Sequence, residues 1–122
     1  MNKNNFVNEN GVFVLKTDEM EIRIVGSAIP DDVLKLAEKI LQLYPERITA
    51  IADCISQDKW IAENYGLTKE QITEKLNKPR ISLYGDNTGV LSYCNNEIDC
   101  DHILDVEFSG ALDEFGYINM DG

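Results

Sequence analysis

The spacing of apolar residues changes twice along this chain of 122 residues, and this change restricts the possible folds more than any other feature. Met20, Ile22 and Ile24 alternate with charged side chains, which is the period of a half-buried strand. From residue 33 to residue 76, apolar side chains recur at helical spacing, and from Ile81 onward the period of two returns. Because helices and strands are segregated along the chain, the pattern predicts an α+β fold rather than repeated βαβ winding.

Two strands are expected before the helices, over residues 11–16 and residues 20–25. A turn at residues 17–19 joins them, and Gly26 closes the pair. The chain is therefore expected to begin with an N-terminal β-hairpin.

Three helices are expected in the middle of the chain. Pro30 and the two aspartates that follow it favour a helix start, because proline suits the first turn and carboxylates complement the positive end of the helix dipole. Pro45 is expected to end or kink this helix, and the second helix stops at Gly66. Thr68 and Gln71 form a capping-box pattern, which begins the third helix.

The last third of the chain predicts four short strands. Residues 81–84 and 90–93 form a hairpin, and strands over residues 102–108 and 115–118 follow. We expect these strands to form a C-terminal antiparallel β-meander packed against the helices. The pattern leaves open whether the strands at the two ends of the chain share one sheet.

The composition predicts one domain over residues 1–122, with 43% hydrophobic and 27% charged residues. No apolar run approaches the roughly 18 residues of a membrane span, and the first residues are polar rather than an apolar signal core. The three cysteines lack CxxC spacing, which favours reduced thiols. The cysteines are Cys54, Cys94 and Cys100. Together these features predict a cytoplasmic protein.

The charge is distributed very unevenly. No lysine or arginine follows Arg80, so residues 81–122 carry nine carboxylates and no basic side chain. This segment accounts for −9 of the formal net charge of −11. Such a field repels nucleic acid and anionic membranes, and it attracts cations or a basic protein. The nine carboxylates are Asp86, Glu97, Asp99, Asp101, Asp105, Glu107, Asp113, Glu114 and Asp121.

The densest polar cluster spans residues 95–102 and supports a metal-site hypothesis. In an extended segment Asp99 and Asp101 would project to one side, and Cys100 and His102 to the other. The carboxylates suit Ca²⁺ or Mg²⁺, whereas the Cys–His pair supplies only two of the four ligands of Zn²⁺. The spacing contains no EF-hand, phosphate-binding loop or catalytic motif, so we assign no metal ligand, cofactor or catalytic residue and do not expect an enzyme.

The stretch from about residue 65 to the end contains a run of recognisable segments. They are Tyr65-Gly66-Leu67-Thr68, a short helix ending in Lys75-Leu76, Ile81-Ser82-Leu83-Tyr84-Gly85-Asp86, Asp101-His102-Ile103-Leu104-Asp105-Val106 and Met120-Asp121-Gly122. With these segments the stretch resembles a small acidic bacterial domain of unknown function, of the toxin-immunity type. This resemblance implies a protein that neutralises a cognate bacterial toxin.

The charge and the resemblance together favour a cytoplasmic immunity or inhibitor protein that is not an enzyme. It would bind a basic protein toxin, with a nuclease as the expected kind, through its acidic C-terminal sheet surface. Asp105 and Glu107 alternate with apolar residues on their strand, so they should face solvent. The candidate contacts are Glu97, Asp99, Asp101, Asp105, Glu107, Asp113 and Glu114.

Two other hypotheses remain at this point. One is a divalent-metal-dependent enzyme or metal-binding module centred on Glu97, Asp99, Asp101 and His102. The other is a module that self-associates through a strand edge or through the apolar helices. The sequence leaves the oligomeric state and the identity of any toxin open.

Overall fold

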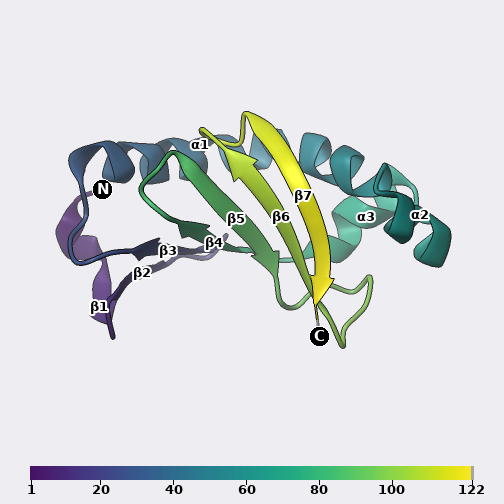
Figure 1. The fold of residues 1–122 in the computed structure, drawn as a ribbon, viewed down its shortest axis with the longest axis horizontal. Helices are drawn as coiled ribbons and strands as arrows, with labels where there is room; N and C mark the ends of the chain where they lie inside the picture. The colour runs from purple at the N-terminus through teal and green to yellow at the C-terminus, as the bar shows by residue number, and fades with distance from the viewer. Residues whose placement is uncertain (122) are drawn as a thin grey trace.

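The computed structural model describes residues 1–121, in which three α-helices pack on a single seven-stranded sheet (Figure 1). This arrangement confirms the predicted α+β fold. A short 3₁₀ helix precedes the first strand. The elements are the 3₁₀ helix Lys3–Asn5, β1 Val7–Glu9, β2 Val12–Lys16, β3 Glu21–Val25, α1 Asp31–Ser56, α2 Lys59–Tyr65, α3 Lys69–Leu76, β4 Arg80–Leu83, β5 Thr88–Tyr93, β6 Ile103–Ser109 and β7 Glu114–Asp121.

The sheet joins the strands from both ends of the chain. Its strand order follows the sequence from β1 to β7, and every neighbouring pair is antiparallel except β3 and β4. These two strands are parallel, with Ile22 opposite Ile81 and Ile24 opposite Leu83. A parallel pair requires a long crossover, and here the three helices provide it. The fold therefore contains one βαβ connection, although the segregated element order argued against such winding.

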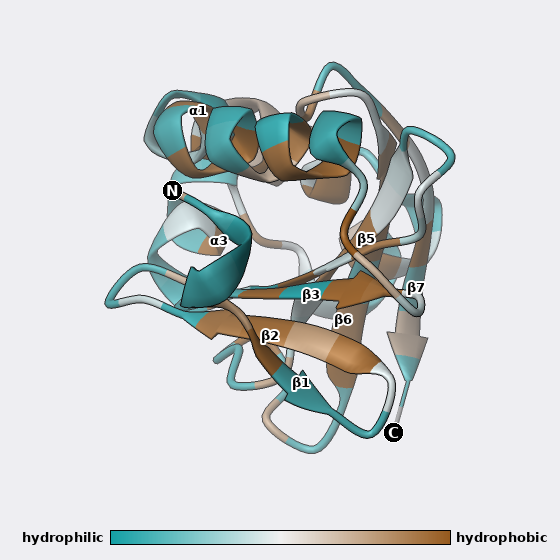
Figure 2. Cartoon of the chain, turned by 90° about the vertical axis from the view of Figure 1, so that its left-hand side faces the viewer, coloured by the Kyte–Doolittle hydropathy of each residue, from teal (hydrophilic) through white to brown (hydrophobic). Residues whose placement is uncertain are grey.

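The helices cover one face of the sheet, called here the inner face. In Figure 1, α1 runs behind the strands, and Figure 2 shows its hydrophobic side turned toward them. Alternate strand residues meet this helix in a single apolar core, while the opposite face, called here the outer face, carries no helix (Figure 1). Core residues from both layers include Ile22, Ile24, Val33, Ala37, Ile40, Ile51, Ile55, Ile81, Leu91, Leu104 and Val106.

The long helix α1 passes through Pro45, so the expected break there is wrong. Pro45 is exposed, whereas Tyr44 before it and Ile51 after it are buried against the sheet. This burial on both sides stabilises one continuous helix and offsets the backbone hydrogen bond that proline cannot make. The chain breaks instead at Asp58, whose carboxylate accepts a hydrogen bond from the backbone N–H of Ile61 and caps α2.

Other predicted boundaries agree with the structure. Gly66 adopts a left-handed conformation and ends α2, and the capping box of Thr68 and Gln71 begins α3. One strand, β1, was not predicted because it is only three residues long. Its signal is Asn10-Gly11, a dipeptide that favours two-residue hairpins; both residues have positive φ, and they connect β1 to β2. Residue 122, which ends the segment of resemblance, lies outside the described residues.

Candidate functional site

The outer face presents carboxylates on β6 because this strand alternates strictly. Leu104, Val106 and Phe108 are buried in the core, so the intervening side chains turn outward. Asp105 is half-buried between Ser92 of β5 and Asn119 of β7. Glu107 is exposed. The period of two in the sequence therefore predicted correctly that Asp105 and Glu107 lie on the face away from the core.

The neighbouring strand β7 extends this acidic surface. Glu114 pairs with Ser109, and Asp121 pairs with Ile103, so both share the parity of the outward residues of β6. We call the four carboxylates the acidic strip. Asp121 was not among the predicted contacts because the expected last strand ended at residue 118, whereas β7 continues to Asp121. The strip consists of Asp105, Glu107, Glu114 and Asp121.

A cleft of about 440 Å³ lies at one end of the acidic strip. Glu107 and Glu114 contribute to its walls, and Tyr84, whose side chain is half-exposed, also lines it. Val90 and Phe115 supply apolar surface. The combination of two carboxylates with aromatic rings matches the chemistry of a lysine or arginine side chain, which has an apolar stem and a charged head.

On the other half of the outer face, β3 and β4 carry basic side chains. Glu21 on β3 accepts hydrogen bonds from Arg23 Nε at 2.6 Å and from Arg80 Nε at 3.1 Å. Partial burial acts to raise the pKa of Glu21, but the hydrogen bond from Arg23 and the charges of both arginines and Lys16 outweigh it and lower that pKa. A second cleft, of about 230 Å³, adds Lys78 to this basic region. The outer face is thus divided into a basic half and an acidic half.

The loop between β5 and β6 is built around a buried amide. Asn96 is only 1% exposed, and its Oδ1 accepts hydrogen bonds from the backbone N–H groups of Ile98 and Asp99. Its Nδ2 donates to the carbonyl groups of Tyr93 and His102. Because these bonds join the two ends of the loop, Asn96 holds the acidic segment in one conformation.

Asp99 is engaged inside this loop. Its Oδ2 accepts a hydrogen bond from the Tyr65 hydroxyl at 2.6 Å and lies 2.9 Å from His102 Nδ1. Its Oδ1 accepts a hydrogen bond from the backbone N–H of Asp101. The imidazole, followed by the Tyr65 hydroxyl, lowers the pKa of Asp99 to about 2, and Asp99 in turn raises the pKa of Tyr65 to about 12. The close contact with Asp99 also raises the pKa of His102, although desolvation acts in the opposite direction.

The expectation that residues 99–102 form an extended segment is wrong. The backbone turns here, and the N–H of His102 donates to the carbonyl of Asp99. Asp99 and His102 therefore approach each other instead of projecting to opposite sides. Within residues 1–121, no three His, Cys, Asp or Glu side chains come together as the ligands of a metal ion would.

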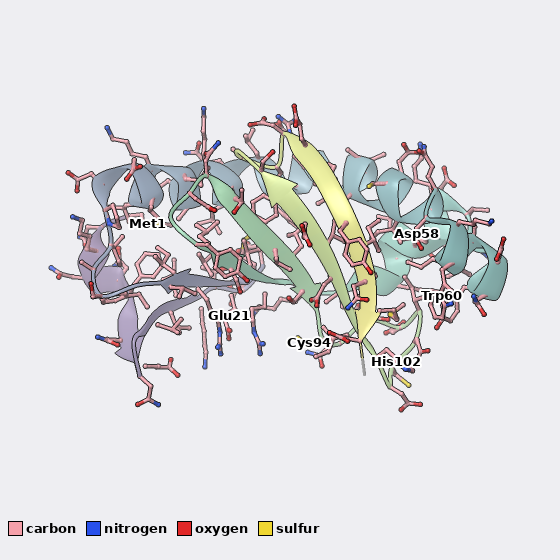
Figure 3. The ribbon with its side chains drawn as sticks, in the orientation of Figure 1. Met1, Glu21, Asp58, Trp60, Cys94 and His102 are labelled. Atoms are coloured by element: carbon pink, nitrogen blue, oxygen red, sulfur yellow. The ribbon has the colours of Figure 1, made fainter. Side chains whose placement is uncertain are left out.

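The seven predicted contact residues lie in three places. Asp105, Glu107 and Glu114 share the outer face. Asp113 closes the turn between β6 and β7, where its carboxylate accepts a hydrogen bond from the N–H of Ala111. The loop residues are the exposed Glu97 and Asp101 together with Asp99. Figure 3 shows His102 in this loop, below the start of β6 and the end of β7.

Sequence reasoning missed an aromatic cleft of about 360 Å³ between α2 and β7. Trp60 and Tyr117 line it and are 52% and 66% exposed. The available signal was the adjacency of Trp60 and Ile61, because adjacent residues on a helix point in different directions and both cannot face the same core. Figure 3 places Asp58 and Trp60 on the α2 side of β7.

None of the helices in residues 1–121 combines the length and the apolar character that crossing a membrane requires. Comparison with protein families, curated proteins and solved structures finds no match to this chain.

Proposed function

We propose that this protein is an inhibitor of the immunity type, which binds and neutralises a basic toxin through the acidic half of its outer sheet face. A nuclease is the expected kind of toxin. The observation that carries this proposal is the acidic strip, in which four carboxylates share one face of β6 and β7 on the side away from the helices. No lysine or arginine follows Arg80, and within residues 1–121 no carboxylate of the strip forms a salt bridge.

The physical argument starts from the partner. A toxin that cleaves nucleic acid presents a basic groove to phosphates, and a carboxylate surface can occupy that groove in place of the substrate. The field of the acidic strip accelerates association at low salt. A hydrogen-bonded sheet presents its carboxylates with little cost in conformational entropy.

The candidate residues take different roles in this proposal. Asp105, Glu107 and Glu114 contact the partner, and the cleft beside Glu107 accepts one of its lysine or arginine side chains. Asp99 and Asp113 act indirectly, because their carboxylates hold the loop and the turn at the two ends of β6. The exposed Glu97 and Asp101 add to the attractive field.

The test begins with affinity capture from the native cell at low and then moderate salt, which identifies the partner for purification. Calorimetry then compares the wild type with the double variant Asp105→Asn/Glu107→Gln. We expect the double variant to bind at least about tenfold more weakly, because charged pairs across an interface are lost. The purified partner should also lose its nucleic-acid cleavage when one equivalent of the wild-type protein is added.

The matched control is Glu46→Gln/Glu63→Gln, which removes the same charge from exposed helical positions. It should bind within about twofold of the wild type, since distant surface charges are screened. Equal affinities of the two double variants for the partner would refute the proposed surface. A partner that keeps full activity in the complex would refute the inhibitory function.

A further inference from the structure

The last strand of the sheet has one edge without a strand partner in the described residues. β7 is terminal in the strand order, and within residues 1–121 no strand pairs with its other edge. Between Glu114 and Asp121 it contains six residues, 115–120, without a charge or a proline. Its pairing with β6 has one register shift, between Val106 and Phe108, and residues 118–121 beyond this shift pair regularly. Natural edge strands are usually short or charged, because a long apolar edge pairs with other chains. The opposite edge, β1, follows this rule with three exposed residues.

An aromatic cleft lies beside this edge. Trp60 from α2 and Tyr117 from β7 line it together with Ile118 and Met120. The Trp60 ring packs edge-on against Tyr65, with ring centroids 5.8 Å apart, and the Tyr65 hydroxyl is bonded to Asp99. Because these contacts fix the position of Trp60, binding in the cleft requires little reordering.

The charges at the two ends of β7 decide what kind of strand can pair with it. In a symmetric dimer with antiparallel β7 strands in full register, Glu114 of one copy would face Asp121 of the other. A shifted register separates these carboxylates but forms no attractive charge pair, since no lysine or arginine lies beyond Arg80. A second copy is therefore disfavoured, whereas a segment with basic residues at its ends is favoured.

We propose that β7 and the aromatic cleft dock an extended segment of the basic partner as an eighth strand of the sheet. A large apolar side chain of this segment enters the cleft between Trp60 and Tyr117, and flanking lysine or arginine residues pair with Glu114 and Asp121. The basic character of the partner rests on the proposed function, and the mode of docking rests on the edge and the cleft.

The probe for this proposal is a library of random decapeptides selected on the immobilised, intact protein. We expect enriched sequences with a large apolar residue flanked by lysine or arginine. Anisotropy of a labelled peptide from this set should give a dissociation constant at least about tenfold weaker for Trp60→Ala and for Tyr117→Ala. Both side chains are largely exposed, so these variants should fold, which circular dichroism checks.

The control is Val7→Ala, which truncates a largely exposed apolar side chain on the opposite edge strand and should leave the affinity for the peptide within about twofold. Failure to enrich any peptide would overturn the proposal, and so would equal binding to Trp60→Ala and to the wild type. If the purified partner depends on Asp105 and Glu107 but not on Trp60, the proposed function stands and the added strand is refuted. If binding of the peptide depends on Trp60 while no basic partner is inhibited, the added strand stands and the proposed inhibitory function is refuted.

Discussion

Two tyrosine hydroxyl groups meet inside the core and satisfy each other. Tyr44 of α1 and Tyr93 of β5 are 6% and 0% exposed, and their oxygens lie 2.8 Å apart. Burial raises the pKa of Tyr44 to about 12, even though the bond to Tyr93 acts in the opposite direction. The pair is a polar contact between the long helix α1 and β5. Disrupting it therefore tests how α1 is positioned along the strands.

Removing one hydroxyl should cost more than removing both. In Tyr93→Phe the Tyr44 hydroxyl stays buried without its partner, and we expect the free energy of unfolding to fall by about 1–3 kcal/mol. The double variant Tyr44→Phe/Tyr93→Phe should recover most of this loss, because no unsatisfied group remains. Urea unfolding of the wild type, the two single variants Tyr44→Phe and Tyr93→Phe, and the double variant measures this double-mutant cycle. Losses that simply add in the double variant would contradict the pairing.

At the scale of the element, α1 illustrates how packing outweighs local propensity. A proline in a helix interior removes one hydrogen bond and crowds the preceding turn. The helix nevertheless continues, since buried side chains on both sides of Pro45 pack on the same sheet. The folded state therefore carries the cost of the missing hydrogen bond, and nothing in the exposed surface position of Pro45 requires a proline ring.

Replacing this proline should stabilise the protein. We expect Pro45→Ala to raise the free energy of unfolding by about 1–3 kcal/mol, the helical penalty of proline less the smaller entropy that proline removes from the unfolded chain. Urea denaturation provides the measurement. The control Thr49→Ala, at another exposed position of α1, should change stability by less than about 1 kcal/mol. A loss of stability in Pro45→Ala would mean that the ring contributes packing which its exposure does not suggest.

At the scale of the whole molecule, the outer sheet face is divided into a basic half and an acidic half. The parallel pairing of β3 with β4 places the basic N-terminal strands beside the acidic C-terminal meander. The total of −11 remains, and most of it lies beyond Arg80. Such an excess of like charge destabilises the compact state through self-repulsion, which added salt screens.

The melting temperature should therefore rise with ionic strength. Between about 20 and 200 mM NaCl the screening length shortens markedly, and each kcal/mol of relieved repulsion corresponds to about 4 °C for a domain of this size. Scanning calorimetry at several salt concentrations measures the slope. The double variant Glu46→Gln/Glu63→Gln carries two fewer charges and should show a smaller rise. A melting temperature that is constant or falls with salt would contradict a dominant role for repulsion.

Several features of this protein were determined by local sequence alone. The period of two predicted which side of β6 faces the core and which side carries Asp105 and Glu107, because that alternation is a property of any strand. The caps at Thr68 and Gly66 were readable for a similar reason, since they satisfy backbone groups within a few residues.

Only the tertiary structure decided the remaining features, because each depends on residues far apart in the chain. The parallel contact of β3 with β4 unites the two groups of strands, and no local pattern specifies it. Tyr65 reaches Asp99 across 34 positions, which turns a predicted surface carboxylate into part of the loop framework. The aromatic cleft exists because α2 lies beside the edge of β7. Local periodicity determines which way a side chain points, whereas long-range packing decides what it meets.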